Sequence, residues 1–231
     1  MNAFLVILLN IAAIVIGSLA GNLLKKTISK NVIDGVMVGI GVVLVFIGAT
    51  GVSKDMSAIA LLIACAVGCF IGYALDLEGR LARLSETIEK HFSTGDNGII
   101  GHGMNFFIVS CSGAYTINAC FFAGMGDFSM LFVKIGLDLL VSFAMSSTLG
   151  IGVMFSVVPL TLYQGMLIQL SGVLSPLLTP VMIDALATTG SIIAALVGAN
   201  MIGITKIKTV NFLPAVVLAP FAAALVERLP I

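Results

Sequence analysis

The sequence contains few charged residues: Asp, Glu, Lys and Arg make up 10% of its 231 positions, whereas a soluble domain carries about 25%. Hydrophobic residues make up 59%. A chain with so little polar surface would not stay dispersed in water, which excludes an ordinary soluble protein. Its formal net charge is zero, so no overall field recruits nucleic acid or acidic substrates.

The sequence also lacks the short motifs that carry enzyme chemistry. It contains no HExxH, GxSxG or GxxxxGK(S/T) pattern. Asp138 follows Gly136 and Leu137, an order that departs from the GxGD arrangement of intramembrane aspartyl proteases. No cluster of Arg and His is present that would hold a lipid phosphate. We therefore expect no enzymatic activity.

Residues that bind metal ions are scarce as well. The sequence has two histidines, His91 and His102. Its cysteines all lie within apolar stretches, where cysteine usually packs as a small hydrophobic residue; they are Cys65, Cys69, Cys111 and Cys120. A metal site needs several such ligands together, so we expect neither a metal nor a cofactor.

Eight apolar stretches fill most of the chain, and each is about long enough to cross a bilayer as a helix. The predicted spans are Ala3–Leu24, Val32–Val52, Ser57–Leu75, Gly103–Gly124, Phe128–Leu149, Val153–Leu174, Val181–Ile204 and Val210–Val226. The predicted fold class is all-α, a polytopic transmembrane helix bundle that forms a single integral membrane domain over residues 1–231. Its main partner is the lipid bilayer.

An amphipathic helix is predicted over residues 77–92, in the only long gap between spans. Leu77, Leu81, Leu84, Ile88 and Phe92 recur at spacings of four and three, and charged residues fill many of the other positions. We expect this helix to lie along the membrane surface. Docking of a partner protein is the alternative. Residues 93–98 then form a flexible turn.

Basic residues in the loops predict the orientation of the chain. With the amino terminus outside, the inner gaps contain Lys25, Lys26, Lys30, Arg80, Arg83, Lys90, Lys206 and Lys208, and the outer gaps and tail contain Lys54 and Arg228. This strong bias favours eight spans with both termini outside.

An echo at an offset of 150 residues indicates an internal repeat. Asp34 recurs as Asp184, and Gly48 recurs as Gly198. The two copies would be residues 1–76 and 153–226. Asp34 lies in the second predicted span and Asp184 in the seventh, an odd offset of five spans, so the repeats would be inverted, as in many transporters that place a site near the membrane midplane. Two unrelated helices, each with an Asp in its first turn, are the alternative.

Polar side chains inside the spans are the candidate functional residues, because a charge in mid-membrane costs about 2.5–3.5 kcal/mol on insertion scales. Lys134, Asp138, Ser142 and Ser146 form a stripe at four-residue spacing. This stripe predicts the lining of a pore or of a substrate site. The alternative is a Lys134–Asp138 pair within one helix, with Lys134 reaching outward and the serines bonded to their own helix.

Other spans contain further polar residues. In the fourth span a polar run extends from Ser110 to Asn118, and Gly113 would mark a break that lines a cavity. Hydrogen bonds between helices are the alternative. The remaining candidates for the pathway of an ion or solute are Asn10, Tyr115, Thr116, Asn118, Tyr163, Gln164, Asn200 and Asn211.

Small residues also recur at four-residue spacing, which lets helix backbones approach closely. Examples are Gly17 with Gly21, Gly35 with Gly39, and Ala64 with Gly68 and Gly72. They predict close packing within the chain, or a homo-oligomer that forms through these glycine-rich faces.

Several stretches carry a family resemblance: residues 75–81 (LDLEGRL), 147–156 (STLGIGVMFS), 162–165 (LYQG), 200–204 (NMIGI) and 211–215 (NFLPA), with Lys134 and Asp138. On these the chain resembles the YqgA/YdfK-like bacterial membrane proteins over nearly its whole length. The resemblance implies an inner-membrane protein of unknown function, loosely regarded as a channel or transporter, with no substrate assigned. The chain departs from that family at Val6-Ile7, where Gly-Thr usually precedes the first intramembrane Asn, here Asn10.

The sequence as a whole predicts a small transporter or channel for a cation or a small polar solute, with Asp138 as the ion or proton site. The alternative is a non-transporting membrane scaffold or partner subunit. In that case the polar residues would be bonded in pairs, and interactions would use the surface helix and the glycine-rich faces.

Overall fold

The computed structural model describes residues 3–25, 27, 29–53, 56–92, 102–103, 106–107, 110 and 114–228. All regular structure within these residues is helical, so the predicted all-α fold class is confirmed. Several features named above lie outside the described residues: Lys26, Lys54, Cys111, Gly113 and the turn at 93–98.

The longer helices match the predicted spans and the predicted amphipathic helix closely, except that the helix ending at Gly124 is shorter than its predicted span. They are α1 (Ala3–Leu24), α2 (Lys30–Thr50), α3 (Ala58–Ala74), α4 (Leu77–Phe92), α6 (Ala114–Gly124), α7 (Ser129–Leu149), α8 (Val157–Leu174), α9 (Pro180–Ile202) and α10 (Leu213–Glu227). Short 3-10 helices are η1 (Ile151–Ser156), η2 (Ser175–Leu177) and η3 (Thr209–Phe212). In the described residues, six helical stretches are long and apolar enough to span a membrane, or seven if the bent pair α3 and α4 forms one span.

Local sequence explains where several of these helices begin and end. The Thr179 side chain accepts a hydrogen bond from the Met182 N–H and caps α9, and Pro180 fits the first helical position. Gly150 (φ 90°) follows the last residue of α7, and Gly203 (φ 85°) follows that of α9. Both take a positive φ that other residues rarely adopt.

The chain divides into two compact units, neither of which is a continuous stretch of sequence. Unit 1 contains residues 1–37, 80–112 and 119–173, and unit 2 contains residues 38–79, 113–118 and 174–231. Contacts between helices far apart in the sequence therefore hold each unit together.

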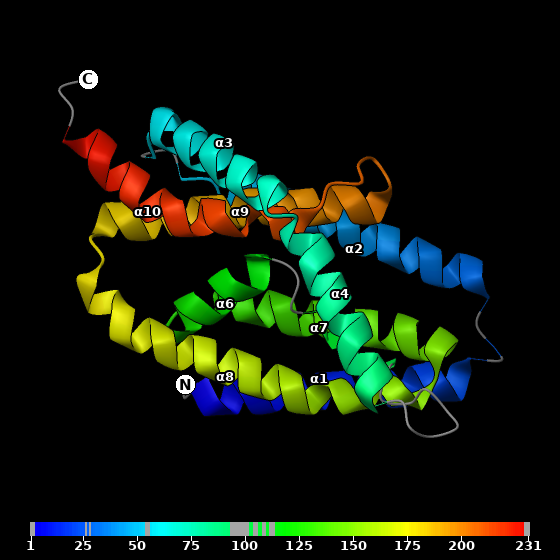
Figure 1. Cartoon of the computed structure of the whole chain (residues 1–231). Helices are drawn as coiled ribbons and strands as arrows, with labels where there is room; N and C mark the ends of the chain where they lie inside the picture. The colour runs from blue at the N-terminus through cyan, green and yellow to red at the C-terminus, as the bar shows by residue number, and fades with distance from the viewer. Residues whose placement is uncertain are drawn as a thin grey trace. The chain divides into compact units, whose positions relative to one another are not determined.

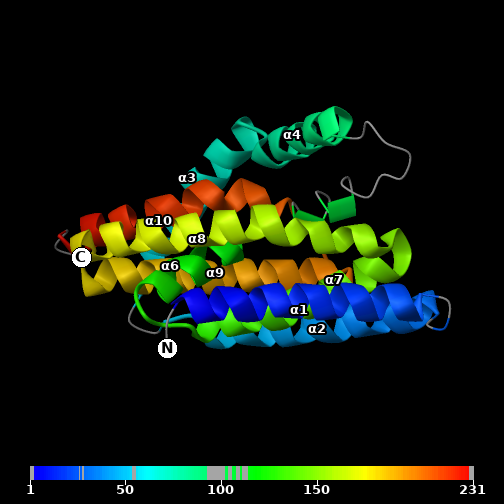
Figure 2. The same cartoon turned by 90° about the horizontal axis from the view of Figure 1, so that it is seen from below.

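In unit 1, α1 and α7 run in the same direction and pack closely (Figure 2). A Cβ added to Gly17 would overlap the Leu139 carbonyl oxygen, and one added to Gly21 would overlap the Phe143 carbonyl oxygen. Moving four residues along α1, from Gly17 to Gly21, moves the contact four residues along α7, from Leu139 to Phe143, so the two helices are parallel. Gly17 and Gly21 therefore allow two helices of the same chain to pack closely, which is the first of the two alternatives predicted for them.

In unit 2, the second half of α2 packs antiparallel against α9 through small residues. A Cβ on Gly41 would lie 2.8 Å from the Gly198 carbonyl oxygen, and one on Gly48 would lie 2.5 Å from the Ser191 carbonyl oxygen. Such close backbone approach requires glycine on at least one helix.

Helix α3 packs antiparallel against α10 in the same unit, and Figure 1 shows the two ribbons together. Gly68 lies against the backbone of Ala215, and Gly72 lies against that of Asn211. Alanines fill the rest of this contact: Ala60, Ala64, Ala219, Ala222 and Ala223, with Ala185 from α9.

The junction of α3 and α4 is fixed by the segment that precedes α10. Asn211 Oδ1 accepts a hydrogen bond from the Glu78 N–H at 2.9 Å, and the Glu78 carboxylate accepts one from the Val210 N–H at 3.3 Å. Asp76 takes a positive φ of 44° and pairs with Lys208 at 3.1 Å. Helix α4 covers the residues predicted for the amphipathic helix.

Candidate functional site

Five buried polar side chains in unit 1 form a connected cluster, which we call the polar layer. Asn10 comes from α1, Lys134 and Asp138 from α7, and Gln164 from α8, while Ser110 precedes α6 in the chain. Each of these residues is 8% exposed or less. Lys134 and Asp138 lie four residues apart, so they share one face of α7.

Asp138 lies at the centre of the hydrogen bonds in this layer. Its Oδ1 forms an ion pair with the Lys134 ammonium and accepts from the Ser110 hydroxyl at 2.7 Å. Its Oδ2 accepts from Asn10 Nδ2 at 3.1 Å. Lys134 Nζ also donates to Ser110 Oγ at 2.6 Å, and Asn10 Nδ2 also donates to Gln164 Oε1 at 3.0 Å. The carboxylate therefore receives donors from α1, from α7 and from Ser110.

Two apolar layers enclose the polar layer along the direction of the helices. Val6, Leu131 and Ile168 belong to the first apolar layer, with Ala119, Cys120 and Ala123 of α6. Ile14, Val153 and Leu160 belong to the second, with Phe106. Along α1 the order is Val6, Asn10, Ile14, and along α8 it is Leu160, Gln164, Ile168, so α1 and α8 are antiparallel. The polar layer is closed by apolar side chains on both sides.

Burial explains why these polar groups gather. An isolated charge in mid-membrane is costly, and breaking a buried pair by removing one partner typically costs about 3–5 kcal/mol. Lys134 and Asp138 neutralise each other, and hydrogen bonds satisfy both. A cation or a hydrogen-bonding molecule that reached this layer would compete with Lys134 or Asn10 for the Asp138 carboxylate.

The structure places three more predicted residues of unit 1 on the helices that carry the polar layer, α7 and α8. The Ser142 hydroxyl bonds to the Leu139 carbonyl of its own helix at 3.0 Å, and the Ser146 hydroxyl donates to the Ser18 carbonyl of α1 at 2.7 Å. Tyr163 precedes Gln164 and packs edge-on against Phe107, with ring centroids 6.2 Å apart.

Lys134 is 3% exposed, so it does not reach outward as the alternative interpretation of the stripe requires, although its pair with Asp138 forms. Ser110 belongs to the network but is not among the predicted pathway residues. The only feature of the sequence that points to it is its first position in the polar run from Ser110 to Asn118.

The other predicted residues belong to unit 2. Tyr115 and Thr116 are buried in the first turn of α6, and Asn118 Nδ2 donates to the Leu186 carbonyl of α9 at 2.7 Å. Asn200 bonds to the loop after its own helix, through Thr205 and Ile207. Asn211 caps the junction before α4, as described above. In Asn118, Asn200 and Asn211 the side chain bonds mainly to backbone groups.

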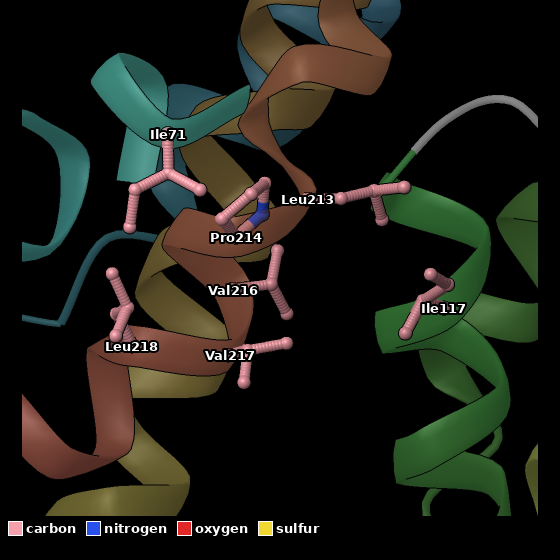
Figure 3. A pocket seen from close by; sticks show the side chains of 7 residues that line it. All are labelled: Ile71, Ile117, Leu213, Pro214, Val216, Val217 and Leu218. Carbon is pink, nitrogen blue, oxygen red and sulfur yellow. The ribbon is translucent and has the colours of Figure 1, made fainter. Parts of the chain in front are cut away.

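Unit 2 contains an apolar groove with a volume of about 460 Å³. Figure 3 shows Val216 and Val217 of α10 facing the same space as Ile117 of α6. The remaining lining residues are Ile71, Leu213, Pro214 and Leu218. Because every lining side chain is apolar, this groove offers no partner to a polar solute.

Metal-ligating residues do not gather in the part of the chain that the structure describes. No group of three or more His, Cys, Asp or Glu residues there is placed to hold a metal ion. The polar layer contains a single carboxylate, and Lys134 already neutralises it.

Comparison with known proteins places the chain in a membrane-protein family. Residues 5–224 match the family described as "Protein of unknown function (DUF554)". The chain is 26% identical to the uncharacterized membrane protein YdfK of Bacillus subtilis over 91% of its own length and 92% of that protein. It is 26% identical to the uncharacterized protein YqgA of Escherichia coli over 94% and 95% of the two chains. No solved structure matches the chain.

Proposed function

Because the chain belongs to this membrane-protein family of unknown function, we propose its function from the site: a small transporter or channel for a cation or a small polar solute. The polar layer is the observation that carries the proposal. Buried ionisable groups in membrane helices commonly mark solute and proton pathways. Asp138 is the proposed ion or proton site, since donors from several segments converge on its carboxylate.

The two apolar layers are the proposed gates. They flank the polar layer on opposite sides along α1 and α8, so opening one layer at a time would expose Asp138 to one side of the membrane at a time. The structure then corresponds to a closed state, in which Lys134 occupies the carboxylate. A solute or proton that binds would loosen this pair and shift the balance between closed and open states.

We propose a bacterial inner membrane as the location, with both termini outside. The positive-inside bias of the loops supports this orientation. The directions of the helices within each unit agree with it: α1 and α7 are parallel, while α1 and α8, α2 and α9, and α3 and α10 are antiparallel pairs. If α1, α2, α3, α6, α7, α8, α9 and α10 cross the membrane in turn, successive spans alternate in direction, and these pairs have the directions observed. The first apolar layer would then face outward.

Inverted repeats are part of the proposal. A repeat with an offset of 150 residues relates Gly41 to Ser191 and Gly48 to Gly198. It therefore exchanges the Gly41–Gly198 contact with the Gly48–Ser191 contact, and both are present in unit 2. An approximate two-fold axis between α2 and α9 would exchange these two contacts in the same way.

Flux through purified protein in liposomes tests the proposed function. We expect a potassium or small-solute gradient to dissipate faster than in empty liposomes, and Asp138→Asn to remove most of the increase. Ser191→Ala, a buried polar change in unit 2, is the matched control and should leave the flux unchanged. If nothing passes, or if Asp138→Asn behaves as the wild type, the proposal is wrong.

A non-transporting scaffold is the second candidate, and the bonding within the polar layer favours it. Every member of the layer has a protein partner, as expected for groups that only hold helices together. In that case α4 would bind another protein. Pull-down with intact protein and with a variant that lacks Leu77–Phe92 distinguishes the two: loss of a stable partner, together with absent flux in both, supports the scaffold.

The proposal includes no enzymatic step and no cofactor. Copies of the chain would associate through α2, where a Cβ added to Gly35 or Gly39 meets no described atom within 4 Å. The neighbouring residues Val32, Val36 and Val43 are exposed and apolar.

A further inference from the structure

The side-chain amides of Asn10 and Gln164 leave one acceptor and one donor unused inside unit 1. Asn10 Oδ1 and Gln164 Nε2 are buried and have no hydrogen-bond partner among the described residues. Asn10 is 1% exposed and Gln164 is 0% exposed. Buried polar atoms in proteins are nearly always hydrogen-bonded, so each of these two atoms requires an explanation.

The orientation of both amides follows from the carboxylate beside them. Asp138, paired with Lys134, can only accept hydrogen bonds, so the NH2 group of Asn10 must face it. The same Nδ2 donates its second hydrogen to Gln164 Oε1. Turning over either amide would bring two acceptors or two donors together. The unused atoms are therefore a true acceptor on Asn10 and a true donor on Gln164.

The charges of the polar layer balance without any ligand. Lys134 and Asp138 are the only charged residues among the buried residues that the structure describes. An added ion would bring an uncompensated charge into apolar surroundings, which is strongly unfavourable. The hydrogens of Gln164 Nε2 would also repel a cation. A neutral molecule meets neither obstacle.

We propose that Asn10 and Gln164 bind a neutral solute that offers a hydrogen-bond donor and an acceptor close together, as a hydroxyl group does on one oxygen and a primary amide does on the N and O of one carbonyl carbon. The solute donates to Asn10 Oδ1 and accepts from Gln164 Nε2. This inference rests on the proposed transport function and selects the polar solute over the cation. Lys134 and Asp138 act as positioning residues, because they fix the orientation of the Asn10 amide.

Proteoliposomes that contain the full chain test this assignment directly. Urea and glycerol serve as neutral probes in osmotic swelling, and potassium and sodium gradients with a potential-sensitive dye report charge movement. We expect swelling in urea or glycerol to be faster than in empty liposomes, with no change of membrane potential in either salt gradient. This measurement uses the unmodified protein, so it does not depend on the folding of a variant.

The Gln164→Met variant then tests the donor, because it keeps the length of the side chain and removes its hydrogen bonds. Neutral-solute flux should fall by about fivefold to tenfold, the factor that one neutral hydrogen bond supports. Ser191→Ala should leave it unchanged. A salt-driven current that Gln164→Met does not alter would overturn this inference and leave the proposed function standing. The absence of any flux would overturn both.

Discussion

Unit 1 and unit 2 use their buried polar groups in different ways. In unit 1 the side chains of the polar layer bond to one another: the Asp138 carboxylate accepts from three other side chains. In unit 2 they bond mainly to backbone, as when Asn118 donates to the Leu186 carbonyl and Asn211 accepts from the Glu78 N–H. Small residues complete the helix contacts of unit 2 at close range.

This difference indicates which unit can rearrange. A side chain bonded to the backbone of another segment fixes that segment, and moving it requires the helices to shift. Side chains bonded to one another can change partners by rotating about their own bonds while the helices stay intact. The polar layer of unit 1 is therefore suited to bind and release a solute, whereas the contacts of unit 2 are suited to hold helices in place.

The largest effect is expected for Lys134→Ala, which leaves Asp138 buried without its partner. Removing one member of a buried ion pair typically destabilises by about 3–5 kcal/mol. Thermal unfolding in detergent, followed by circular dichroism, measures this loss. The double variant Lys134→Leu with Asp138→Leu should regain much of the stability and stay inactive in flux. A Lys134→Ala protein that melts like the wild type would show that the pair does not matter for stability.

The next largest effect is expected for a Leu→Ala change, which can be compared at one buried leucine in each unit. Leu160 lies in the second apolar layer of unit 1 and Leu44 lies in unit 2, and both are 1% exposed. Each Leu→Ala change should destabilise by about 2–5 kcal/mol, because it leaves a cavity. Only Leu160→Ala should raise solute leak, since it thins a proposed gate. Equal leak from both variants would remove the distinction between the units.

A smaller effect is expected from glycine substitutions. A Cβ at Gly72 would overlap the Asn211 backbone, so Gly72→Ala should destabilise by about 1–3 kcal/mol through overpacking. Gly172→Ala in α8 is the matched control, because a Cβ there meets no described atom within 4 Å. Its stability should stay the same or rise by up to about 1 kcal/mol, since alanine favours a helix over glycine. The melting temperature of Gly172→Ala should equal or exceed that of the wild type, and that of Gly72→Ala should be lower than both; the reverse order contradicts the close contact.

The smallest effect is expected for Lys208→Ala, which removes the pair with Asp76 at the junction of α3 and α4. Both side chains are nearly half exposed, at 49% and 42%, so solvent weakens their attraction. Loss of such a pair costs about 0.2–1 kcal/mol. Flux should be unaffected. A loss of stability much larger than this would show that the pair stabilises the junction more strongly than an exposed ion pair should.

The fold was largely predictable from sequence because a bilayer leaves few options for an apolar chain. The predicted spans and the predicted amphipathic helix over 77–92 match α1 to α4 and α7 to α10 within a few residues. The four-residue spacing also predicted that Lys134 and Asp138 share one face. The shorter α6 is the exception, since its predicted span began at Gly103.

The composition of the polar layer was less predictable. Periodicity tells which residues share a face of one helix, but it does not tell which helix lies opposite. Asn10 and Gln164 meet across 154 positions. The sequence does not distinguish them from Asn200, which bonds to the loop after α9, or from Asn211, which bonds to the first turn of α4. Ser110 also joins the layer, and its first position in the polar run is the only feature of the sequence that distinguishes it from the rest of that run.

The central claim is that water and solute reach the polar layer of unit 1, and thiol labelling tests it most directly. In a chain whose four native cysteines are replaced by alanine, Gln164→Cys should react with a membrane-impermeant maleimide, and urea or glycerol should slow the reaction. Leu44→Cys, equally buried in unit 2, should stay unlabelled until the protein is denatured. If Gln164→Cys also reacts only after denaturation, no solute reaches the layer and the account is contradicted.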